Sequence, residues 1–152
     1  MAAYPEIKML IGGEWIAQGG DGEIPVVNPA TEAVIASCPK VSTEQLNSAL
    51  AAANEAFLSW SKTPGVERHK IMRRAADLVR ERADSIARIV TLEMGKPQAQ
   101  ALGETLNAAE IIDFMGEEAK RQGGRLVPVR SASLLEQRVT NEPIGPAALF
   151  TP

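Results

Sequence analysis

Pro146-Ala147-Ala148-Leu149-Phe150-Thr151-Pro152 is the most informative run of this sequence. It is short, uncharged and largely apolar, a pattern typical of a parallel β-strand that helices cover on both faces. In open α/β sheets, ligands bind just beyond the carboxyl ends of such strands. The run therefore predicts an α/β fold, and we expect the chain to stop where a binding loop would begin.

Size and composition are those of an ordinary globular domain. The chain has 152 residues, of which 45% are hydrophobic and 23% charged, enough for a core. A net charge of −3 gives no attraction to nucleic acid or to an anionic membrane, so neither is an expected partner. No apolar run approaches the roughly 20 residues that cross a bilayer, and no signal peptide is indicated. The single cysteine, Cys38, cannot form an internal disulfide, which fits a cytoplasmic location.

Short strands are expected before residue 40. Glycines separate the apolar runs at 8–11 and 14–16, and this pattern is typical of hairpins. Two further runs, 24–27 and 33–38, flank Asn28-Pro29-Ala30-Thr31, where proline at the second position presets φ for a β-turn.

Helical periodicity dominates the middle of the chain. Ser42-Thr43-Glu44-Gln45 predicts a capping box for a first helix, whose apolar stripe we interpret as a core face. Thr63 as cap and Pro64 as first residue predict a second helix that stops at Gly95-Lys96-Pro97. A third helix is expected to end at Gly123-Gly124.

Two extended segments, 125–129 and 134–140, follow the helices. The second has mixed polarity, so it is weakly specified on its own. We expect it to pair with another part of a larger molecule or with another subunit.

The sequence lacks the complete form of three familiar binding motifs. Gly95-Lys96 lacks the partners of a phosphate-binding loop, because Val90 and Pro97 stand where glycine and Ser or Thr are required. The glycines between 12 and 22 do not form the dinucleotide fingerprint. One histidine and one cysteine cannot build a zinc site.

The remaining reactive residues have structural interpretations. Cys38 is a candidate nucleophile, but a cysteine in an apolar strand is more often a small buried side chain. His69 is a candidate for catalysis among cationic neighbours, but an exposed helix position explains it equally well. The basic run at 68–88 alternates with acids, which favours a solvated helix face. By themselves these residues give an α/β domain without an assembled active site.

Taken in order, several segments resemble the amino-terminal part of the aldehyde dehydrogenase superfamily. The matching pieces span nearly the whole chain: Ile11-Gly12-Gly13-Glu14-Trp15, Val27-Asn28-Pro29-Ala30-Thr31, Ala56-Phe57 with Trp60, Glu67-Arg68, Ala76-Asp77-Leu78 with Glu81-Arg82, Thr91-Leu92-Glu93-Met94-Gly95-Lys96-Pro97, Glu104 and Glu142-Pro143-Ile144-Gly145. Within the superfamily, segments 92–97 and 116–121 are similar to succinate-semialdehyde dehydrogenase and its relatives. The family's first cofactor strand ends in Thr-Pro-Trp-Asn, and Thr151-Pro152 match its first two residues.

For a longer parent protein, the resemblance implies oxidation of an aldehyde, such as succinic semialdehyde, to a carboxylic acid with NAD or NADP. In this family a cysteine thiolate attacks the aldehyde, the thiohemiacetal gives hydride to the nicotinamide, and a glutamate activates water. An asparagine side chain and a backbone amide hold the oxyanion. No residue of this chain matches these groups, Cys38 included, so we expect no catalytic residue here and an inactive isolated chain.

The resemblance also implies an architecture. Short strands and hairpins would precede three helices that cover a parallel, Rossmann-like sheet. Residues 1–124 would form part of the NAD(P)-binding domain, 125–142 the oligomerisation strands of a dimer or tetramer, and 143–152 the first strand of the cofactor-binding sheet.

Two sets of site residues carry over from the family. Phe150, Thr151 and Pro152 match a strand end that lies against the adenosine half of the cofactor. The Val27 carbonyl and Glu93 match positions that hold a structural monovalent cation in some members. Both sites are expectations for the complete enzyme.

Two other classes of protein fit parts of the sequence. One is a stand-alone helical interaction module that offers its unpaired strands to a partner. The weaker one is a nucleic-acid binder that uses the helix at 68–88.

Overall fold

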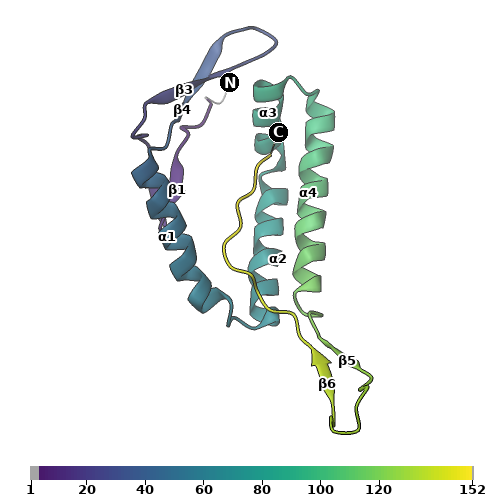
Figure 1. The fold of residues 1–152 in the computed structure, drawn as a ribbon. Helices are drawn as coiled ribbons and strands as arrows, with labels where there is room; N and C mark the ends of the chain where they lie inside the picture. The colour runs from purple at the N-terminus through teal and green to yellow at the C-terminus, as the bar shows by residue number, and fades with distance from the viewer. Residues whose placement is uncertain (1–3, 152) are drawn as a thin grey trace.

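The computed structural model describes residues 4–151. Its elements are, in chain order, β1 (Met9–Ile11), β2 (Glu14–Ile16), β3 (Glu23–Val27), β4 (Val34–Pro39), α1 (Thr43–Trp60), α2 (Gly65–Glu81), α3 (Ala83–Met94), α4 (Gln98–Glu118), β5 (Arg125–Val127) and β6 (Gln137–Val139). Helices α2 and α3 follow one another alongside α4, while α1 and the first two hairpins form a separate arm (Figure 1). No helix within residues 4–151 combines the length and apolarity that a membrane span requires.

The predicted hairpins are confirmed. Each sheet in residues 4–151 is an antiparallel pair: β1 with β2, β3 with β4, and β5 with β6. The turn between β3 and β4 is closed by the Asn28 amide, which donates to the Ala33 carbonyl at 2.9 Å. The Asn28 side chain accepts from the Ala30 amide, the asparagine turn that the sequence favours here. The segment at 134–140, which was expected to pair outside this part of the chain, contributes β6, and β6 pairs with β5 of the preceding extended segment.

The capping box of α1 is also confirmed. The Gln45 amide donates to Ser42 Oγ, and the Ser42 amide donates to Gln45 Oε1. However, α1 buries none of its residues, and Leu46, Leu50 and Trp60 are 50%, 53% and 43% exposed. The prediction that its apolar stripe is a core face is therefore wrong within this chain, because α1 contacts little besides β1.

The expected second helix is two helices. Arg82 has φ −106° and ψ 9°, which ends α2 and starts α3, although no glycine or proline marks the break. The break lets both helices pack against α4. Thr63 is not the cap of α2, because its hydroxyl donates to the Ser59 carbonyl of the preceding helix. The last helix ends at Glu118, ahead of the expected Gly123-Gly124.

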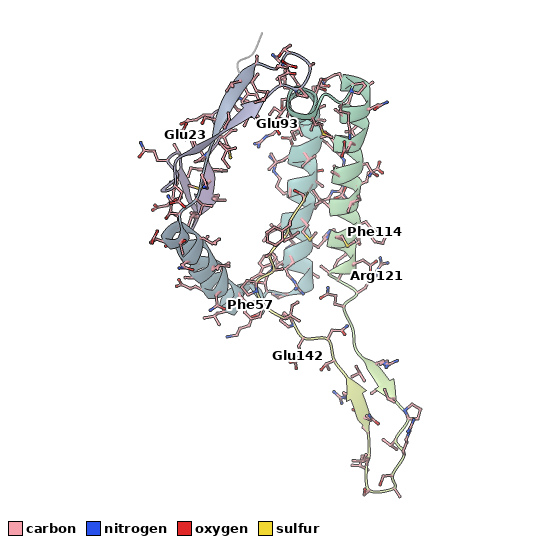
Figure 2. The ribbon with its side chains drawn as sticks, turned by 45° about the horizontal axis from the view of Figure 1, so that its top comes forward. Glu23, Phe57, Glu93, Phe114, Arg121 and Glu142 are labelled. Atoms are coloured by element: carbon pink, nitrogen blue, oxygen red, sulfur yellow. The ribbon has the colours of Figure 1, made fainter. Side chains whose placement is uncertain are left out.

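Small residues form the interface between α4 and its two partner helices. Within residues 4–151, five alanines make up the buried hydrophobic core: Ala76, Ala83, Ala87, Ala101 and Ala109. Thr105 is buried beside them, and its hydroxyl donates to the Ala101 carbonyl at 2.9 Å. Larger apolar side chains remain outside this interface. Phe114 of α4, for example, is 58% exposed (Figure 2).

Residues 143–151 have no regular secondary structure. The apolar run at 146–152 was expected to be a strand of a parallel sheet, and over 146–151 this strand is not formed. A strand needs a neighbour for its backbone groups, and none lies beside this segment within the described residues. Consequently Leu149 and Phe150 are 84% and 95% exposed.

Candidate functional site

Two segments that are far apart in the sequence meet at the end of α3. Gly95 caps the helix with φ 72°, a left-handed conformation that favours glycine. A side chain there would also meet Pro29, because an added Cβ would lie 3.3 Å from Pro29 Cγ. The fold therefore places the β3–β4 turn, residues 28–31, on the loop that follows α3.

Glu93 lies in the last turn of α3 and is engaged by a residue near the amino terminus. The Tyr4 hydroxyl donates a hydrogen bond to the Glu93 carboxylate. Partial burial, and then the hydrogen bond and negative charge of Glu93, raise the pKa of Tyr4 to about 12. Sequence reasoning missed this pair, because neither residue belongs to a local motif that joins them.

Val27 and Glu93, the two expected cation positions, each lie two residues before a partner in the contact between Pro29 and Gly95. Val27 is the last residue of β3 and is 43% exposed. Carboxylate and carbonyl oxygens suit hard cations. A cation here would compete with Tyr4 for the Glu93 carboxylate. Among residues 4–151, no cluster of three or more His, Cys, Asp or Glu side chains could hold a metal ion.

The expected cofactor positions do not form a site on their own. Phe150 is 95% exposed and Thr151 is exposed, whereas Pro152 lies outside the described residues. No backbone cradle surrounds them, because residues 143–151 lack strand pairing. The described residues therefore do not fit a nicotinamide nucleotide by themselves.

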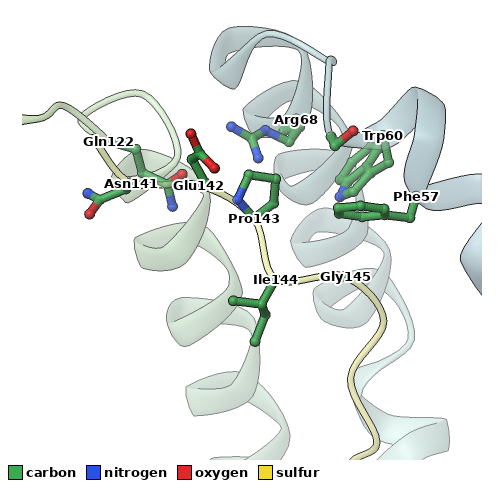
Figure 3. Close-up of a pocket in the computed structure, with 10 residues that line it drawn as sticks. Phe57, Trp60, Arg68, Gln122, Asn141, Glu142, Pro143, Ile144 and Gly145 are labelled. Atoms are coloured by element: carbon green, nitrogen blue, oxygen red, sulfur yellow. The ribbon is translucent and has the colours of Figure 1, made fainter. Parts of the chain in front are cut away.

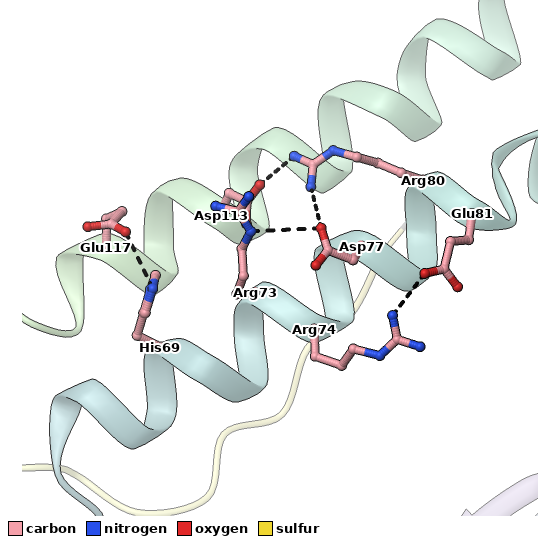
Figure 4. A network of polar contacts seen from close by, with 8 residues as sticks. All are labelled: His69, Arg73, Arg74, Asp77, Arg80, Glu81, Asp113 and Glu117. Atoms are coloured by element: carbon pink, nitrogen blue, oxygen red, sulfur yellow. Dashed lines mark hydrogen bonds and ion pairs between the residues drawn. The ribbon is translucent and has the colours of Figure 1, made fainter.

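The two reactive side chains singled out in the sequence lie in different parts of the molecule. Cys38 is half-buried in β4, opposite Ile24, with its sulfur 3.9 Å from the Pro39 carbonyl oxygen. His69 Nε2 lies 3.5 Å from Glu117 Oε1, across the interface of α2 and α4 (Figure 4). His69 is thus half-buried in helix packing, and the exposed position expected for it is wrong.

Ion pairs extend along the same helix interface. Arg73 and Arg74 are 59% and 60% exposed, in agreement with the predicted solvated face. Arg80, in contrast, donates to Asp113 of α4, and this hydrogen bond raises the pKa of Arg80 (Figure 4). Asp113 stands between apolar residues of the last helix, a position that could have signalled a charge facing another helix.

Comparison with known proteins identifies the family. Residues 15–152 match the model of the aldehyde dehydrogenase family. The chain belongs to this family. The mitochondrial succinate-semialdehyde dehydrogenase of Arabidopsis thaliana is 38% identical over 145 residues, which cover 94% of this chain and 27% of that protein. The NADP-dependent succinate-semialdehyde dehydrogenase GabD of Escherichia coli is 39% identical over 147 residues, covering 95% of this chain and 30% of the relative.

Solved aldehyde dehydrogenase structures share the fold. Succinate-semialdehyde dehydrogenase from Burkholderia pseudomallei aligns with a TM-score of 0.78 and 38% identity, over 83% of this chain and 26% of that one. The aldehyde dehydrogenase from Brucella melitensis aligns with a TM-score of 0.78 and 40% identity, over 82% and 26%. The expected α/β fold of the aldehyde dehydrogenase amino-terminal part is confirmed. The chain spans less than a third of the length of these relatives.

Proposed function

We propose that this chain is the amino-terminal portion of an NAD(P)-dependent aldehyde dehydrogenase that oxidises a semialdehyde to a carboxylic acid through a cysteine thiohemiacetal. The family match over residues 15–152 carries the proposal. The contact of residues 28–31 with Gly95 supports it, since both segments belong to the family resemblance. Relatives are named for succinate, glutarate and malonate semialdehydes, which favours an aldehyde that also bears a carboxylate.

The contribution of residues 1–152 is structural in this proposal. Cys38 and His69, the two reactive side chains considered for catalysis, lie in separate elements and have other contacts. Residues 1–124 would belong to the NAD(P)-binding domain, and 143–152 would become a strand once a neighbouring strand pairs with them. Phe150, Thr151 and Pro152 would then lie against the cofactor.

Three further features belong to the same proposal. The β5–β6 hairpin, within the oligomerisation segment 125–142, extends away from the helices and would join subunits of a dimer or tetramer (Figure 1). Val27 and Glu93 would bind a structural monovalent cation. The single cysteine supports a cytoplasmic location, although one relative is named as mitochondrial.

A chimera tests the proposal directly. This chain would replace the matching segment of the Escherichia coli relative, which is 39% identical, and the purified chimera would be assayed for formation of reduced nicotinamide with succinic semialdehyde. We expect activity from the chimera and none from the relative with the segment deleted. A folded chimera that binds NADP without oxidising the aldehyde would contradict the proposal.

The 152-residue chain alone should give no reduced nicotinamide with NAD or NADP. A rise in the absorbance of reduced nicotinamide, in a preparation free of other dehydrogenases, would overturn the structural role assigned to this segment.

A second candidate is a stand-alone interaction module. It is favoured by the exposed apolar residues of the hairpin, where Leu126 is 70% exposed and Leu135 is fully exposed. Size-exclusion chromatography with calorimetric melting separates the two candidates. A cooperative melt of a monomer favours the module, whereas aggregation or a diffuse transition favours part of a larger enzyme.

A further inference from the structure

The start of the carboxy-terminal segment lies in a cleft formed with the junction of α1 and α2. The cleft has a volume of about 610 Å³ and joins residues more than seventy positions apart in the sequence (Figure 3). Phe57 and Trp60 of α1 form an apolar wall, and Arg68 of α2 lies next to them. The opposite wall is residues 141–145. The cleft thus connects the helices with the segment proposed to reach the cofactor.

Arg68 carries an unsatisfied donor in this cleft. Its Nε atom is buried and has no hydrogen-bond partner within the described residues. Other arginines of α2 differ, because Arg73, Arg74 and Arg80 each have a carboxylate within ion-pair distance. Burying a charged donor without an acceptor is costly, so an acceptor is expected in this cleft.

Glu142 is the acidic residue that lines the cleft. No basic group in residues 4–151 lies within ion-pair distance of its carboxylate. The preceding residue is fixed, because Asn141 Nδ2 donates to the Gly123 carbonyl at 3.1 Å. In Figure 3 the Glu142 carboxylate and the Arg68 guanidinium group both lie above Pro143. A side-chain rotation on an anchored backbone would bring the two charges together.

We propose that Arg68 is a positioning residue, which pairs with Glu142 and holds the start of the 142–151 segment against α1 and α2. Guanidinium and carboxylate groups form strong charge-assisted hydrogen bonds, and Nε is a natural member of such a pair. The pair closes the cleft over Trp60. It fixes the direction in which the chain leaves towards Phe150. The role assigned to that far end rests on the proposed function, but the pair itself does not.

Nuclear magnetic resonance of the 152-residue chain with ¹⁵N-labelled arginine tests the pair. The Nε–H signal of Arg68 is identified by its loss in Arg68→Lys. In Glu142→Gln, which changes an exposed loop residue, we expect exchange of this proton with water to be about fivefold faster, as loss of a coupling of ordinary size predicts. Emission from Trp60, measured in a Trp15→Phe background, should shift to the red in the same variant.

Glu67→Gln is the matched control, because Glu67 is an exposed acid on the same helix and pairs with Lys70. It should leave both signals unchanged. Exchange that is the same in Glu142→Gln and in the unaltered chain would overturn the proposal. Slower exchange of the Arg68 Nε proton in the unaltered chain on addition of acetate would also overturn the proposal, because it would identify an anion site in place of the pair. Activity of the chimera reports on the proposed function alone, so the two failures are distinguishable.

Discussion

The hydroxyl of Tyr4 donates a hydrogen bond to the carboxylate of Glu93, 89 positions later in the sequence. This contact attaches the start of the chain to the last turn of α3, beside the place where the β3–β4 turn packs on Gly95. The region expected to bind a cation is therefore held by three separate segments of the chain.

The Tyr4–Glu93 contact predicts a pH dependence of stability. The pKa of Tyr4 is raised from 10.0 to about 12 in the folded chain, so the folded state keeps a proton that the unfolded state loses. The stabilisation is therefore complete below pH 10 and is lost as the pH rises towards 12. Because Tyr4 is the single tyrosine, its tyrosinate absorbance reports the titration directly.

Two variants check the cause of this shift. Glu93→Gln should move the titration of Tyr4 back towards its ordinary range, since the negative charge is removed. Tyr4→Phe should reduce the loss of thermal stability between pH 10 and 12 by the contribution of Tyr4. A tyrosinate titration near the ordinary value in the unaltered chain would contradict the contact.

Two glycines of α4 should respond oppositely to alanine. Gly103 has no atom within 4 Å of an added Cβ, so Gly103→Ala should stabilise the chain by about 1 kcal/mol through helix propensity. At Gly116 an added Cβ would lie 3.2 Å from Met72 Cβ, which the backbone of α2 fixes in place. Gly116→Ala should therefore be destabilising, by roughly 1 kcal/mol or more. Urea unfolding of both variants measures the difference, and equal effects would show that α2 and α4 do not pack closely here.

Gln45, in the first turn of α1, binds the glycine-rich turn at residues 18–22 that precedes β3. Its Oε1 accepts from the amides of Ser42 and Gly20 at 3.0 and 2.8 Å, and its Nε2 donates to the Gln18 carbonyl at 3.1 Å. Gln45→Ala should cost about 2 kcal/mol of unfolding free energy, as three hydrogen bonds are lost. Gln45→Glu keeps the two acceptor contacts and should cost roughly half as much. Equal losses in the two variants would show that the two acceptor contacts, with Ser42 and Gly20, contribute nothing.

Local chemistry made much of the fold predictable. The capping box at Ser42 and the turn at Asn28 depend on neighbours in the sequence, and both formed as expected. The break at Arg82 was missed because it has no local signal and arises from packing of two helices against α4. The strand at 146–152 was expected from its apolar pattern and from the family resemblance, whereas a strand forms only beside another strand.

The candidate site was less predictable for a related reason. The family resemblance pointed to Val27 and Glu93, but the partner of Glu93 is Tyr4, which no motif connects to it. The buried, unpartnered Nε of Arg68 likewise depends on how α1, α2 and residues 141–145 come together. Such contacts join segments that are distant in the sequence, so they could not be predicted without the fold.

The exposed end of the chain yields a final prediction. Phe150 is 95% exposed, so Phe150→Ser should change the free energy of unfolding by less than about 0.5 kcal/mol. Ala109 has no exposed surface, and Ala109→Leu should cost about 1–3 kcal/mol by overpacking the interface of α4. In the chimera with the Escherichia coli relative, Phe150→Ser should become strongly destabilising, because the segment would then pair within a sheet. Calorimetric melting of each variant in both contexts measures these effects. A large loss in the 152-residue chain itself would show that residues 143–151 already pack against the helices.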